Sequence, residues 1–102
     1  MKKISIIIRN KNEERWINHC LKSIFRQDYP SFEVILVDNR STDNTLSIAK
    51  RYPIAKYINI DEFKPGRAIN EGIAVSNGEL ICCISAHCIP KKENWLSTLA
   101  NN

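Results

Sequence analysis

Residues 32–45, FEVILVDNRSTDNT, join a short apolar run to a cluster of residues that favour turns and helix caps. The run from Glu33 to Val37 is rich in β-branched residues, which predicts a strand buried on both faces of a sheet. The strand ends at Asp38, and Ser41 or Thr42 can cap a following helix with Asp43 in its first turn. This strand–turn–helix pattern is half of a βαβ unit, in which ligands bind beyond the carboxyl end of the strand.

The rest of the chain repeats the alternation of strand and helix. The predicted strands cover 4–8, 33–37, 55–60 and 79–84. The first predicted helix starts at Asn12 or Glu13, and the other three cover 46–52, 67–75 and 92–99. Asn77-Gly78 is expected to end the third helix in a left-handed conformation. The pattern predicts an α/β fold: a Rossmann-like open parallel sheet of order 3-2-1-4, with helices on both faces.

Length and composition indicate one globular domain over 1–102. The chain is 43% hydrophobic and 25% charged, with a net charge of +4. Its basic residues are scattered and are not interleaved with aromatic residues. This favours a small anionic ligand and no nucleic-acid partner.

The N-terminal apolar run and the cysteines indicate the compartment. Residues 4–8 are too few for a signal peptide or a membrane span, so we expect no transmembrane segment. The four cysteines form no C-x-x-C pair, and we expect reduced, mostly buried thiols in a cytoplasmic protein. Cys82 and Cys83 point to opposite faces of one strand, which argues against a zinc site shared with His87 and Cys88.

The predicted strand order brings three polar segments to one crevice. In a 3-2-1-4 sheet the switch point falls between strands one and four, so the ends of strands one, two and four converge. These ends carry residues 9–12, 38–40 and 85–88.

Four segments, in this order and spacing, resemble the N-terminal part of family 2 glycosyltransferases of the GT-A fold. They are SIIIRNKNEE (5–14), CLKSI (20–24) with Gln27 and Tyr29-Pro30, VILVDNRSTDNT (34–45) and GRAINEGIAVSNGELI (66–81). The resemblance covers essentially the whole chain, and it implies the nucleotide-sugar-binding part of such an enzyme, with the C-terminal half of the domain missing. The implied reaction is transfer of a sugar, with inversion, from a nucleotide-diphosphate donor to a glycan or glycoconjugate acceptor.

The resemblance also implies roles for particular residues. Arg9 and Lys11 would line the sides of the pocket for the nucleotide base, and Asp38 would accept a hydrogen bond from the base. Asn39 replaces the second aspartate that is commoner in the family. Arg67, beside Gly66, would face the diphosphate, while Asn70 and Gly72 would serve helix packing. The nucleotide-sugar site carried over in this way comprises Arg9, Asn10, Lys11, Asn12, Glu13, Asp38, Asn39, Arg40, Gly66, Arg67, Ser85, Ala86 and His87.

The segment after the fourth strand departs from the family pattern. The usual Asp-x-Asp, which holds Mn²⁺ or Mg²⁺ against the diphosphate, is replaced by Ser85-Ala86-His87. Two alternatives follow. Either His87 is one ligand of an altered metal site, or cationic groups neutralise the diphosphate instead.

The family's catalytic base lies in a later acidic segment, and no residue of this chain is assigned that role. A non-catalytic nucleotide-binding module of the same fold is therefore an alternative. A nucleotidyltransferase is disfavoured because residues 9–14 contain no glycine. The leading hypothesis places the protein in bacterial-type polysaccharide or glycoconjugate synthesis, in the cytoplasm or at the inner face of the membrane, with any membrane association peripheral.

Overall fold

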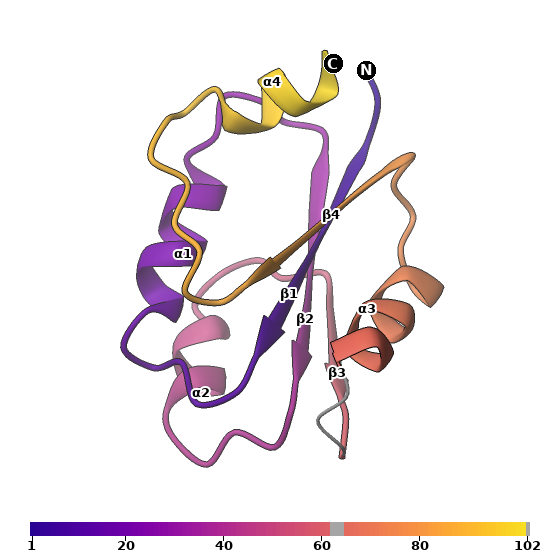
Figure 1. The fold of residues 1–102 in the computed structure, drawn as a ribbon. Helices are drawn as coiled ribbons and strands as arrows, with labels where there is room; N and C mark the ends of the chain where they lie inside the picture. Colours follow the sequence, from indigo (N-terminus) through magenta and orange to yellow (C-terminus); the bar gives the residue numbers. More distant parts are fainter. Residues whose placement is uncertain (62–64, 102) are drawn as a thin grey trace.

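The computed structural model of the chain describes residues 1–61 and 65–101 and contains a four-stranded parallel sheet of order β3-β2-β1-β4 (Figure 1). Parallel pairing joins β1 to both β2 and β4, and β2 to β3. The predicted order 3-2-1-4 is therefore confirmed. The strands are β1 (Ile4–Asn10), β2 (Phe32–Asp38), β3 (Lys56–Asn59) and β4 (Leu80–Ser85).

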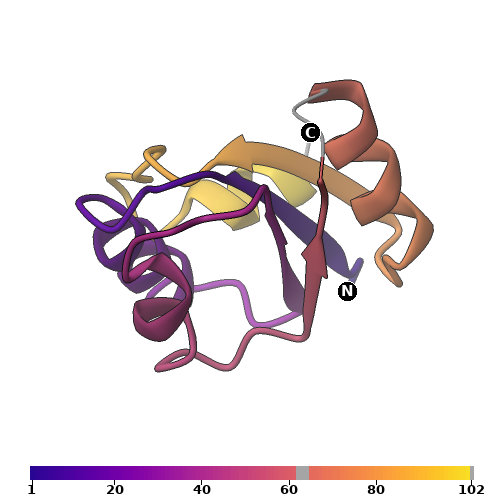
Figure 2. The same cartoon turned by 90° about the horizontal axis from the view of Figure 1, so that it is seen from below.

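Helices cover both faces of the sheet, as predicted. Three of them pack on one face: α1 (Ile17–Phe25), α2 (Thr45–Ala49) and α4 (Trp95–Ala100). On the opposite face lies α3 (Pro65–Ala74), and the view from below shows it across the strands from α1 and α2 (Figure 2). None of the described helices is long and apolar enough to cross a membrane.

The alternation of side chains along β1 divides the core into two parts. Ile4, Ile6 and Ile8 pack under α1, α2 and α4, whereas Ile7 packs toward α3. All four isoleucines are at most 1% exposed, which confirms burial on both faces of the central strands.

The predicted start of the first helix is wrong, because α1 begins at Ile17. Asn12 has a φ of 50°, outside the helical region, and Trp16 and Ile17 both donate their N–H groups to the carbonyl of Glu13 in a turn. The predicted cap of the second helix is also wrong. The residue before α2 is Asn44, and the hydroxyl of Ser41 bonds to the first loop instead.

Gly78 does not have the left-handed conformation predicted for it. A Cβ atom there would lie 2.5 Å from Ser5 Oγ and 2.6 Å from the Ser5 backbone nitrogen, so the close approach of two backbones requires glycine. The packing role expected for Gly72 is confirmed, since a Cβ atom there would lie 2.5 Å from Cγ2 of Ile7 beneath α3.

The cysteines are free, as predicted, but only Cys20 is fully buried, so the expectation of mostly buried thiols is wrong. Burial raises the pKa of Cys20 to about 12 and that of Cys82 to about 11, so both stay protonated at neutral pH. Cys88 is half-buried. Cys83 is exposed on the edge strand β4, at a position in register with Ile7.

Glu33 organises the amino ends of the strands. Its buried carboxylate accepts hydrogen bonds from the Ser5 hydroxyl and from the N–H of Asn77, both at 2.6 Å, and the Lys3 ammonium lies 3.9 Å away. Burial alone would raise the pKa of Glu33, but these hydrogen bonds and the nearby lysines outweigh it and lower the pKa below its ordinary value of 4.5.

Replacing Glu33 should therefore change how stability depends on pH. A depressed pKa means that the charged carboxylate stabilises the fold above pH 4.5, and that this contribution is lost as the pH falls through the folded-state pKa. We expect Glu33→Gln to lower the free energy of unfolding by about 1–3 kcal/mol at pH 7 and by less in acid. Denaturant unfolding at several pH values measures this, with Glu79→Gln, at an exposed position, as the matched control. Equal losses at all pH values would contradict it.

Candidate functional site

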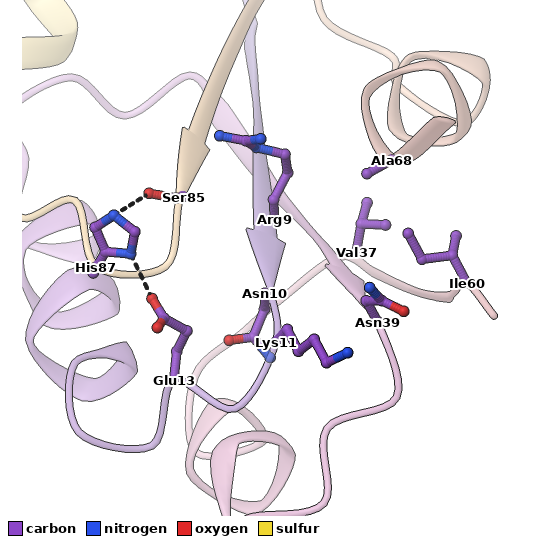
Figure 3. A pocket seen from close by; sticks show the side chains of 10 residues that line it. All are labelled: Arg9, Asn10, Lys11, Glu13, Val37, Asn39, Ile60, Ala68, Ser85 and His87. Atoms are coloured by element: carbon purple, nitrogen blue, oxygen red, sulfur yellow. Dashed lines mark hydrogen bonds and ion pairs between the residues drawn. The ribbon is translucent and has the colours of Figure 1, made fainter. Parts of the chain in front are cut away.

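A crevice of about 210 Å³ lies at the carboxyl ends of β1, β2 and β4 (Figure 3). This is the edge at which the predicted topology brings the polar segments together. Its lining comes from the ends of these strands, the loops that follow them, the residue after β3 and one turn of α3. The lining residues are Arg9, Asn10, Lys11, Glu13, Val37, Asn39, Ile60, Ala68, Ser85 and His87.

The two sides of the crevice differ in chemistry. Figure 3 shows Val37, Ile60 and Ala68 together on the α3 side, and Glu13, Ser85 and His87 on the other. The side chains of Arg9 and Lys11 lie between them. An apolar wall that faces a polar, cationic region suits a ligand with a flat ring at one end and negative charge at the other.

The carboxylate of Asp38 ties together the loops that follow β1 and β2. It is 3% exposed and accepts three hydrogen bonds: from Asn10 Nδ2 at 2.6 Å, from the Ser41 hydroxyl at 2.5 Å and from the Ser41 N–H at 3.0 Å. Because a buried carboxylate needs such donors, these bonds hold both loops in one arrangement.

Further contacts fasten the same two loops. The Ser41 hydroxyl accepts the N–H of Asn12, and Thr45 Oγ1 accepts the N–H of Glu13, both at 2.9 Å. Asp43 accepts the N–H of Glu14 at 3.1 Å. Burial raises the pKa of Asp43, but hydrogen bonds from Thr45 and Glu14 outweigh this and bring the pKa below its ordinary value.

Asp38 and Asn39 point in opposite directions. Asp38 follows the strand face that packs under α1 and α2, whereas Asn39 continues the face of Ile35 and Val37, toward α3 and the crevice. Asn39 is 5% exposed, and among the described residues its Nδ2 has no hydrogen-bond partner. The Oδ1 of Asn10 is likewise buried without one, because its Nδ2 faces Asp38. Two amide atoms of residues that line the crevice are thus buried without a partner among the described residues.

A chain of hydrogen bonds crosses the polar side. The Nδ1 atom of His87 lies 2.7 Å from Glu13 Oε2, and its Nε2 lies 3.0 Å from Ser85 Oγ. A carboxylate accepts hydrogen bonds, so Nδ1 carries a proton. Both ring nitrogens of His87 are therefore engaged by the protein.

These residues do not fit a Mn²⁺ or Mg²⁺ site. Hard cations prefer several carboxylate oxygens, and here a hydroxyl and a single imidazole stand at the end of β4 in place of carboxylates. Within residues 1–61 and 65–101, no group of three His, Cys, Asp or Glu side chains could hold a metal ion.

The crevice contains seven of the residues predicted for the site: Arg9, Asn10, Lys11, Glu13, Asn39, Ser85 and His87. The others lie outside its lining. Arg40 is exposed and pairs with Asp61 at 3.3 Å, and Gly66 and Arg67 border a separate depression on α3, where Arg67 lies 3.7 Å from Glu71. In full, the predicted site residues that do not line the crevice are Asn12, Asp38, Arg40, Gly66, Arg67 and Ala86.

Val37, Ile60 and Ala68 were not predicted as site residues. The alternation of side chains along a strand could have predicted Val37, because residues two positions apart, such as Val37 and Asn39, point to the same face of the sheet. For Ile60 and Ala68 the sequence carries no local signal, because the packing of α3 on the sheet brings them to the crevice.

Comparison with known proteins gives relatives along nearly the whole chain. A glucuronosyltransferase of Methanococcus voltae, named as acting on a dolichyl N-acetyl-glucosaminyl phosphate, is 37% identical over 98 residues, which are 88% of this chain and 30% of that protein. The poly(ribitol-phosphate) β-N-acetylglucosaminyltransferase TarS of Staphylococcus aureus is 31% identical over 91% of this chain and 18% of its own length. The chain thus spans less than a third of either relative.

Solved structures share the fold. The crystal structure of S. aureus TarS 1-349 in complex with UDP-GlcNAc matches with a TM-score of 0.88 and 28% identity, over 97% of this chain and 30% of that one. The Pyrobaculum calidifontis mannosyltransferase PcManGT, in complex with GDP-Man and Mn²⁺, matches with a TM-score of 0.86 and 25% identity, over 97% and 31%. The family model described as glycosyl transferase family 2 matches residues 5–102, and the chain belongs to that family.

Proposed function

We propose that the crevice binds the nucleotide of a nucleotide-sugar donor, and that the protein transfers the sugar, with inversion, to a glycan or glycoconjugate acceptor. The observation that carries the proposal is the crevice itself, in which an apolar wall with a buried amide faces a cationic, hydrogen-bonding region. A nucleoside diphosphate has the complementary form, with an aromatic base at one end and phosphates at the other. No described residue is assigned as the catalytic base.

The base belongs on the α3 side of the crevice. Val37, Ile60 and Ala68 offer an apolar surface for the ring, and Asn39 offers an amide that can both donate and accept. The edges of uracil and guanine carry donors and acceptors side by side, so this amide suits either base. The phosphates then extend past Arg9 and Lys11 toward Ser85 and His87.

The relatives support the donor and acceptor classes. TarS is described with UDP-GlcNAc and PcManGT with GDP-Man, and the acceptor in the name of TarS is a poly(ribitol phosphate). By analogy we place this protein in the synthesis of a surface polysaccharide or glycoconjugate, at the cytoplasmic side of a membrane. This placement rests on family likeness.

The geometry favours a positioning role for Asp38, in place of the direct contact with the base that the sequence predicted. Its carboxylate is committed to Asn10 and Ser41, whereas the neighbouring Asn39 lines the crevice. We propose that Asp38 holds the loops and Asn39 contacts the base. Arg67 lies outside the lining of the crevice, 3.7 Å from Glu71 on α3.

Asn39→Ala should weaken nucleotide binding with little effect on stability. The substitution removes a hydrogen-bonding group from the ligand, which should raise the Kd for UDP or GDP by about tenfold. Stability should hold or rise slightly, because a buried amide nitrogen without a partner is removed. Ligand-observed NMR measures the binding, with Asn70→Ala, an exposed residue of α3, as the matched control. An unchanged Kd for Asn39→Ala would refute the assignment.

Asp38→Ala should instead destabilise the fold. Its removal takes away the acceptor that Asn10 Nδ2 and the hydroxyl and N–H of Ser41 share, which should cost at least about 2 kcal/mol of unfolding free energy. Thermal and denaturant unfolding measure this beside Asn39→Ala. If Asp38→Ala kept full stability and lost only nucleotide binding, Asp38 would contact the base directly, as the sequence predicted.

A further inference from the structure

The polar side of the crevice lacks the pair of negative charges that a divalent cation would neutralise. Two carboxylates at the end of β4 would repel a diphosphate, so a metal ion would have to neutralise them. Here a neutral hydroxyl and an imidazole stand in those places, at Ser85 and His87, and this source of repulsion is absent.

The carboxylate that does line this side is committed to a partner. Glu13 is held at 2.7 Å from His87 Nδ1, and its side chain is 22% exposed. A metal bound at Nε2 of His87 would have to replace the 3.0 Å contact with Ser85, whereas the contact between Nδ1 and Glu13 could remain. The cluster Glu13–His87–Ser85 is thus satisfied as a set of hydrogen bonds.

Positive charge is supplied by the same lining. The lining contains two cationic side chains, Arg9 and Lys11, and one carboxylate, that of Glu13. Arg9 lies opposite Ser85 in the register of β1 and β4, and in Figure 3 its guanidinium lies on the Ser85 side of Lys11. Guanidinium and ammonium groups pair well with phosphate oxygens.

We propose that this crevice binds the donor diphosphate without a divalent cation, with Arg9 and Lys11 supplying the positive charge and Ser85 and His87 occupying the place of metal-binding acids. The inference rests on the proposed nucleotide-sugar site. It distinguishes this chain from PcManGT, whose structure is described with Mn²⁺.

Isothermal titration calorimetry of UDP and GDP with the purified protein tests the inference. The protein is first stripped of metal and is then titrated in EDTA and, separately, in millimolar Mn²⁺. We expect the Kd of the better-bound nucleotide to differ by less than about threefold between the two conditions. In EDTA, Lys11→Gln should raise the Kd by about tenfold, while Lys91→Gln, an exposed control outside the crevice, should not change it.

A double substitution restores the metal-binding acids. Ser85→Asp with His87→Asp should weaken binding in EDTA and make it respond to Mn²⁺ by at least about tenfold, whereas Lys91→Asp should not. If the parent protein itself binds more than about threefold tighter in Mn²⁺, the inference is overturned and the nucleotide site stands. Absence of binding in both conditions would overturn the proposed function and the inference with it.

Discussion

The three hydrogen bonds to the carboxylate of Asp38 hold together the two loops that frame the crevice. A side chain with a carboxyl group that is 3% exposed is stable only while its hydrogen-bond partners stay in place. This requirement fixes Asn10 at the end of β1 and Ser41 after β2. Asn10 lines the crevice beside this bond, and strand alternation turns Asn39 toward the crevice as well. The arrangement of the crevice therefore depends on a residue that does not line it.

The fold could be predicted from the sequence because its determinants are local. The apolar runs of β1 and β2 and the helices between strands imply a parallel sheet, and right-handed crossovers leave few strand orders. The first loop could not be predicted in the same way. The N–H groups of Asn12 and Glu13 bond to side chains 29 and 32 residues away, so their helical appearance in the sequence is misleading.

The strand ends that meet at the crevice were easier to predict than the side chains that line it. The strand ends at Arg9, Asn39 and Ser85 do converge, as the topology requires. Whether Asp38 or Asn39 lines the crevice depends on which sheet face each residue occupies, and the period of two along β2 contains that information. The contact between Glu13 and His87 joins residues 74 positions apart, which no local pattern indicates.

A crystal structure of the protein with bound UDP or GDP tests the central claim most directly. The account predicts the base against Val37, Ile60 and Ala68 within hydrogen-bond distance of Asn39, and the diphosphate beside Arg9 and Ser85. A nucleotide seated elsewhere, such as the depression at Gly66 and Arg67 on α3, would contradict it.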